Sequence, residues 1–264
     1  MLNEPARQMM RPWPPDGAVF AATSGIKEAA MFYRLTKLQG YSIDAADGTI
    51  GCVEDVYFDA EWWGVRYFVV RAGNWLRGRE VLISPRAIRP GAWSGEAIPT
   101  NLSREQIEKS PPVDTGHPVS RHYEMTHAAH YRDDPYWNGP HSRAGGPFGM
   151  LLGTAQLQPG NEGRQLEAIA EREIEAAERS HLRSGAEVVG YDIAAMDGTI
   201  GTVEDFLIDD ENWSVGYLLV DKRNWVASGH VLIPVEALDY IDWGAGLVRL
   251  TMTRDEVTRS AGYP

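Results

Sequence analysis

Adjacent carboxylates occur twice in the chain, as Glu54-Asp55 and Glu204-Asp205. Paired carboxylates support acid–base catalysis when their surroundings push their pKa values apart. Neighbouring residues on a strand point to opposite faces, however, so the two acids of each pair are not expected to meet at one substrate. We therefore expect Asp55 and Asp205 to accept hydrogen bonds from backbone amides of a turn or bulge, and we expect no catalytic residue.

Five of the seven histidines lie between residues 117 and 141. Two of them, His127 and His130, are three residues apart, so on a helix they would share a face and offer two metal ligands. The spacing matches no standard metal site, and Cys52 is the only cysteine. We therefore expect solvated linker histidines without a metal, and a buried, inert thiol at Cys52. The five histidines are His117, His122, His127, His130 and His141.

Three pairs of tryptophans recur at a separation of 150 residues. Tryptophan packs well in cores and also concentrates binding energy at protein interfaces, so both roles stay open for these pairs. Trp75 and Trp225 lie in the least regular connection of the predicted fold and are the preferred partner-binding residues. Further candidates are Trp63 and Trp213, and the third pair is Trp93 and Trp243.

These residues belong to an internal repeat. When the chain is shifted by 150 residues, 27 of the 71 positions from 40 to 110 are identical, without a gap. A single duplication of this period indicates tandem domains, because the units of solenoid proteins are only about 20–50 residues long. We predict a non-structural extension over residues 1–30, a first repeat over 31–110, a linker over 111–180 and a second repeat over 181–264.

The local pattern of each repeat is typical of β structure. Asp47-Gly48 and Asp197-Gly198 predict hairpin turns, and a bulge is expected near Glu54-Asp55 where the apolar alternation breaks. Residues 65–70 and 215–220 are apolar on both faces, which suits a strand of a small closed barrel. Each repeat ends in a helical turn with a capping box, opened by Ser103 or Thr253.

The linker is rich in proline and glycine and is expected to be partly irregular. A short helix is predicted over residues 119–131. A second helix, near residues 163–180, has a thin apolar stripe. It would pack against a barrel, pack against its own copy in a dimer, or remain a solvated linker helix.

In both repeats Gly-Tyr is followed by an Asp-Gly turn, by Ile-Gly-x-Val-Glu-Asp and, after an apolar strand, by Val-Leu-Ile. This order resembles the PRC-barrel family, which includes the cytoplasmic domain of the photosynthetic reaction-centre H subunit and the C-terminal domain of a ribosome maturation factor. The resemblance implies a mainly β chain with two small antiparallel PRC-type β-barrels in tandem, joined by a partly helical linker. It also implies docking onto other macromolecules, with no shared catalytic residues and no cofactor.

The charge distribution narrows the range of partners. The formal net charge of -12 disfavours nucleic acid, and no apolar run approaches the roughly 18 residues needed to span a bilayer. Residues 34–110 are electrically balanced, whereas residues 181–260 carry fourteen acids and six bases, so contact between unlike repeats is favoured. We expect the repeats to pack about a pseudo-twofold axis, each covering apolar surface of the other.

The sequence favours a non-enzymatic protein-binding or scaffolding module. Its partner would be another protein or a second copy of the chain, including as a homodimer. The alternative is a small-ligand or metal-binding regulatory protein. With one cysteine no internal disulfide is possible, which indicates a reducing compartment, and we expect a bacterial cytoplasm.

Overall fold

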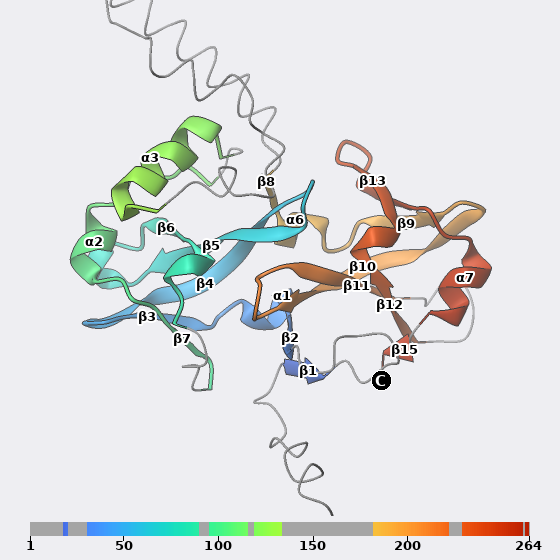
Figure 1. The fold of residues 1–264 in the computed structure, drawn as a ribbon, viewed down its shortest axis with the longest axis horizontal. Helices are drawn as coiled ribbons and strands as arrows, with labels where there is room; N and C mark the ends of the chain where they lie inside the picture. The colour runs from blue at the N-terminus through green and yellow to red at the C-terminus, as the bar shows by residue number, and fades with distance from the viewer. Residues whose placement is uncertain are drawn as a thin grey trace, which may run out of the picture.

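The computed structural model of the chain describes residues 18–20, 31–89, 95–115, 119–133, 182–221, 229–260 and 262–263. We refer to residues 31–110 as repeat 1 and to residues 181–264 as repeat 2. Their elements follow one another in the same order (Figure 1). Repeat 1 contains β2 (Met31–Arg34), α1 (Leu35–Leu38), β3 (Ser42–Ala45), β4 (Gly48–Asp59), β5 (Gly64–Ala72), η2 (Asn74–Leu76), β6 (Glu80–Ile83), η3 (Pro85–Ala87), β7 (Ala97–Pro99) and α2 (Arg104–Glu108). Repeat 2 contains β8 (Leu182–Ser184), α6 (Gly185–Val188), β9 (Asp192–Ala195), β10 (Gly198–Asp209), β11 (Val215–Asp221), β12 (His230–Pro234), η5 (Val235–Ala237), β13 (Leu238–Asp242), β14 (Leu247–Leu250), α7 (Arg254–Arg259) and β15 (Gly262–Tyr263).

Each repeat is built on one sheet. The strand order is β6-β5-β4-β3-β7 in repeat 1 and β13-β14-β9-β10-β11-β12-β15 in repeat 2. All described pairs are antiparallel except β3 with β7 and β9 with β14. These two parallel pairs have the same register, since Ser42 lies opposite Ala97 and Asp192 opposite Leu247. The prediction of two equivalent, mainly β repeats is therefore confirmed.

The long strand β4 is shaped by its turn and by two bulges. Gly48 has a φ of 139°, which a glycine adopts without strain, and it follows Asp47 in the predicted hairpin turn to β3. Register shifts leave Ile50 and Glu54 as extra residues on β4. The second shift confirms the predicted bulge, and β10 repeats it between Val203 and Asp205.

Cys52 was expected to be buried, and the bulge at Ile50 explains why it is not. Strict alternation would place Cys52 on the buried face with Ile50, but Cys52 is exposed. The extra residue at Ile50 reverses the alternation, so Val53 takes the inward position instead. The thiol therefore lies on the outside of the sheet, opposite Ser42 and Arg71.

The first strand of each repeat pairs with the sheet of the other repeat. β2 is antiparallel to β10, with Tyr33 opposite Ile208, and β8 is antiparallel to β4, with Arg183 opposite Phe58. The two registers are related by the same shift of 150 residues. Figure 1 shows β2 beside the strands of repeat 2 and β8 beside those of repeat 1. The repeats are thus joined by a reciprocal strand exchange about the predicted pseudo-twofold axis.

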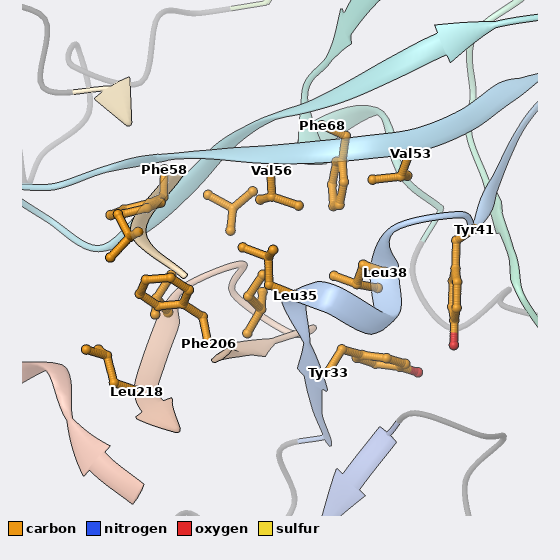
Figure 2. Close-up of a cluster of buried hydrophobic side chains, with 14 of the residues drawn as sticks. Tyr33, Leu35, Leu38, Tyr41, Val53, Val56, Phe58, Phe68, Phe206 and Leu218 are labelled. Atoms are coloured by element: carbon orange, nitrogen blue, oxygen red, sulfur yellow. The ribbon is translucent and has the colours of Figure 1, made fainter. Parts of the chain in front are cut away.

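One hydrophobic core runs through both repeats. Leu35 of α1 is fully buried in a cluster that includes Val56 of repeat 1 together with Phe206 and Leu218 of repeat 2 (Figure 2). The rings of Phe58 and Phe206 meet across the boundary with their centroids 5.5 Å apart. Side chains of this size, removed completely from water, contribute about 1.5–3 kcal/mol each to folding. The two barrels therefore share a core and stabilise one another.

The predicted short linker helix is present as α3 (Arg121–Tyr131). The side chain of Ser120 accepts a hydrogen bond from the backbone amide of Tyr123 and so caps its start. Val113, Val119 and the first turn of α3 lie against the outer face of the repeat 1 sheet. Cover of this face by α3 was not predicted, since the expected covers were the other repeat and the helix near residues 163–180. That face consists of Tyr57, Tyr67, Val69, Leu82 and Leu182, packed with Val119, Val113 and Tyr123.

Both predicted capping boxes are confirmed. Ser103 accepts from the backbone amide of Gln106 at the start of α2, and Thr253 accepts from that of Glu256 at the start of α7. Three residues of the expected non-structural extension, Ala18–Phe20, form β1 and pair with β2, because Ala-Val-Phe continues the sheet beside a short edge strand. The remainder of that extension and the helix expected near residues 163–180 lie outside the described residues.

Candidate functional site

The bulge in β4 places Asp55 at the boundary between the repeats. Its Oδ1 accepts hydrogen bonds from the backbone amides of Val56, at 2.7 Å, and Ala186, at 3.0 Å. Its Oδ2 accepts a hydrogen bond from the hydroxyl of Ser184 at 2.5 Å. Burial raises the pKa of the Asp55 carboxyl, and the three hydrogen bonds oppose that rise. Asp55 thus caps the first turn of α6, an element of the other repeat.

Asp205 has the same position in repeat 2 and is fully buried. Its Oδ1 accepts from the backbone amides of Phe206, at 2.8 Å, and Thr36, at 3.1 Å. Its Oδ2 accepts from the hydroxyl of Thr36 and from Nε of Arg34, the latter at 2.8 Å. The expectation that Asp55 and Asp205 bind backbone amides is confirmed, and half of those amides come from the other repeat.

The two glutamates of the acidic pairs behave differently. In repeat 2 the Arg34 guanidinium bonds Glu204 Oε1 at 3.0 Å as well as Asp205, so both acids converge on one cation. In this pair the two side chains lie on the same side of the strand, unlike neighbours in regular alternation, because the bulge re-aims them. In repeat 1 Glu54 bonds Arg71 within its own repeat, away from Asp55.

Trp63 and Trp213 lie where the repeats meet. Each has a left-handed φ of 56°, which is uncommon for a residue with a bulky side chain. The carbonyl of Trp63 accepts from the amide of Val215 at 2.6 Å, and that of Trp213 accepts from Val65 at 2.7 Å. The Trp213 ring packs edge-on against Phe68 of repeat 1, with centroids 5.1 Å apart. These two candidate partner residues are thus engaged between the repeats.

Trp75 occupies a different place. It packs against the core of repeat 1, and its indole N–H donates to the carbonyl of Ile50 at 2.8 Å. The Arg104 guanidinium carbon lies 5.2 Å from the centre of the ring. Trp225, its counterpart in repeat 2, lies outside the described residues, as does Trp93. Trp243 lies beneath the Arg183 guanidinium, with its carbon 4.6 Å from the ring centre.

Trp62 is an exposed aromatic residue that was not among the predicted candidates. Its side chain is 49% exposed in the turn between β4 and β5, directly before Trp63. The residue at the same position in repeat 2 is Asn212, whose amide bonds Asp209 at 3.1 Å. Selecting only tryptophans that recur in both repeats therefore hid Trp62. Its neighbour Glu61 is also exposed.

The histidines predicted to be solvated separate into two kinds. His127 is buried against Tyr67 and Tyr131, and its Nε2 lies 2.9 Å from the carbonyl oxygen of Leu82. Burial lowers the pKa of His127 to about 4. The expectation of a solvated side chain is wrong here, because His127 is on the face of α3 that packs on the sheet. His122 is exposed, as expected.

His130 lies with Nε2 2.7 Å from the carbonyl oxygen of Gln106, so both histidines once considered as a metal pair contact backbone carbonyls. Within the described ranges, no three His, Cys, Asp or Glu side chains are grouped so as to hold a metal ion. His117 and His141 lie outside those ranges. No helix in the described parts of the chain is long and apolar enough to cross a membrane.

Comparison with known proteins assigns the fold to a family. No curated protein matches the chain significantly. The family model of the PRC-barrel domain matches two regions, residues 31–97 and residues 181–256. Together they make up more than half of the chain, and they contain most strands of the two sheets, including the exchanged strands β2 and β8. The chain therefore belongs to the PRC-barrel domain family, as a tandem of two such domains.

Proposed function

We propose that this protein is a non-enzymatic scaffold that binds another protein. The observation that carries the proposal concerns Asp55 and Asp205, the carboxylates that recur in both repeats. Each accepts hydrogen bonds from the other repeat and so holds the two repeats together. Groups fixed in this way set the geometry of an assembly and are not free to act on a substrate. The two barrels would then act as one rigid body that presents surface residues to a partner.

The filled interiors support the same proposal. Phe58, Phe68 and Phe206 are completely buried among aliphatic side chains in the shared core. Small barrels with interiors of this kind are packed by their own side chains. Recognition would therefore take place on the outer surface.

We propose Trp62 as the anchor for the partner. It is one of three large apolar side chains found exposed in the described part of the chain, the others being Met196 and Tyr240. Tryptophan is enriched among residues that dominate binding energy, because a large ring can be desolvated at little conformational cost. An exposed ring of this size favours a partner with an apolar pocket. The single cysteine cannot form an internal disulfide, which fits a reducing compartment, and we propose that the protein acts in a bacterial cytoplasm.

The test compares Trp62→Ala with the matched control Asn212→Ala at the equivalent turn. Tagged full chains would capture proteins from an extract of the native host, and each captured protein would be purified and titrated by calorimetry. We expect a partner that binds the wild type and the control alike and binds Trp62→Ala at least about tenfold more weakly, as for a hot-spot residue. Equal binding by all three chains, or the absence of any partner, would overturn the proposal. Circular dichroism would confirm that both variants are folded.

A further inference from the structure

The exchanged segments of the two repeats fit the other repeat better than they would fit their own kind. The first sign is at α1 and α6, which meet across the pseudo-twofold axis. Leu35 opens α1 and is fully buried, whereas Gly185 holds the equivalent position in α6. A Cβ placed on Gly185 would lie 2.1 Å from Cδ1 of Leu35. The bare backbone of one repeat thus receives the large side chain of the other.

The second sign is at β2 and β11. A Cβ on Gly216 would lie 2.9 Å from Cε1 of Phe32, so the Phe32 ring rests directly on the glycine backbone. In repeat 1 the position equivalent to Gly216 is Arg66, whose guanidinium lies 3.5 Å from Asp59. If repeat 1 paired with another repeat 1, Phe32 would meet this arginine. That contact would either bury the cation or displace the ring.

The third sign is electrostatic. Arg34, on the exchanged strand of repeat 1, is neutralised by Glu204 and Asp205 of repeat 2. The equivalent residue of repeat 2 is Ser184. If repeat 2 paired with another repeat 2, Ser184 would replace this arginine, and the buried Asp205 would lose the guanidinium that it binds. Size and charge therefore both select the pairing of repeat 1 with repeat 2.

We propose that this surface also recognises a second copy of the chain, with repeat 1 of each copy pairing with repeat 2 of the other. The contacts just described do not depend on which chain supplies each repeat, so both interfaces of such a dimer are those of the closed monomer. The balance between the two forms then depends on the effective concentration of one repeat for the other within a single chain, and exchange becomes favourable as the chain concentration approaches that value. Like repeats do not pair, and this leaves a closed, twofold dimer as the product of exchange.

Complementary variants would reveal the exchange. One full chain carries Gly185→Leu, which drives a side chain into Leu35, and the other carries Leu35→Gly, which leaves a cavity. Each is poorly packed as a closed monomer. When the two are unfolded, mixed and refolded, repeat 1 of the first chain meets Gly185 of the second, and the enlarged residue 185 meets the emptied position 35. Both interfaces of the mixed dimer are then filled.

We expect the mixture to give a 1:1 dimer by light scattering, with a melting temperature well above that of either chain alone. Dyes attached to Cys52, the single and exposed cysteine, would show energy transfer between the copies. A mixture that contains only monomers with the melting temperatures of its two components would overturn the proposal. If Gly185→Leu does not fold alone, the milder pair Gly185→Ala and Leu35→Ala provides the same readout.

A single chain that carries both Leu35→Gly and Gly185→Leu is the control. It should be a monomer whose stability is restored relative to each single change. A double variant no more stable than the singles would show that the two positions are not complementary and would refute the argument at its first step. Trp62 remains exposed in the closed chain, so failure of exchange and failure of the proposed partner site are separate results.

Discussion

Asp55 and Asp205 occupy equivalent bulges in repeats of the same architecture, yet they hold different partners. Asp205 is completely buried and faces the charged guanidinium of Arg34, whereas Asp55 faces the neutral hydroxyl of Ser184. Both also accept an amide hydrogen bond from the first turn of the exchanged helix. The role that both acids share is therefore to bind the backbone amide of the exchanged helix. The side chain that each acid also binds differs between the repeats.

The largest expected effect separates the two acids directly. Asp205→Ala leaves the Arg34 guanidinium and the Thr36 amide without their buried acceptor and should cost about 3 kcal/mol of the free energy of unfolding. Asp55→Ala removes the acceptor of three neutral donors, the amides of Val56 and Ala186 and the hydroxyl of Ser184, and should cost about half as much, ~1.5 kcal/mol. Urea denaturation of the full chain measures both. Equal losses would mean that the arginine adds nothing to the repeat 2 site.

The next largest expected effect is the pH dependence of stability caused by His127, on the outer face of repeat 1. His127 is neutral when buried, and its pKa is lowered to about 4 from an ordinary value of 6.5. A base with a depressed pKa stabilises the fold fully above 6.5, and that contribution is lost as the pH falls towards 4. The wild type should therefore lose about 3 kcal/mol relative to His127→Gln between pH 7 and pH 4. Parallel pH profiles of the two chains would contradict this packing.

A smaller effect tests the ionisation of Asp55. Because burial raises its pKa, the folded chain holds the Asp55 proton more tightly than the unfolded chain does. The stability that this proton gives is present below the ordinary pKa of 3.8 and is lost as the pH rises through the raised value. The cost of Asp55→Asn should therefore be greater at pH 3.5 than at pH 7. Unfolding experiments on both chains across this range check the sign, and the opposite trend would refute it.

The smallest effect should be the same in both repeats. Ser103→Ala and Thr253→Ala each remove the side-chain half of a capping box at the start of a short helix. Each should cost about 1 kcal/mol. Thermal unfolding followed by circular dichroism compares the two. A clear difference between them would show that α2 and α7 do not contribute equally, despite their matching geometry.

Local features of the fold could be predicted because short stretches of sequence determine them. The Asp47-Gly48 turn, the bulge at Glu54-Asp55 and both capping boxes depend on residues only a few positions apart. The exchange of first strands could not be predicted in this way. β4 and β10 have similar sequences and equivalent bulges, so these strands alone do not determine which of them pairs with β2. The choice depends on contacts between distant residues, such as Leu35 with Gly185.

Two side chains were misjudged for related reasons. His127 was predicted to be solvated because the surrounding linker is rich in proline and glycine. Tyr123 and Tyr131, however, lie four residues before and after it. That spacing places the three on one face of a helix and was the signal of a packed face. Trp62 was not selected as a candidate because only tryptophans present in both repeats were considered. Its difference from Asn212 was the informative feature.

The strand exchange also determines when the protein can finish folding. Arg34 lies 170 residues from its partner Glu204, and β2 has no described sheet to join until β10 has been made. At about 5–20 residues per second, the ribosome needs roughly ten seconds or more to synthesise the intervening chain. Throughout that time repeat 1 lacks β8, and β2 lacks its acceptor. On a polysome, several nascent copies lie close together. A chain whose repeat 2 has just emerged can therefore meet repeat 1 of a neighbouring chain that still lacks its own β8 and β10.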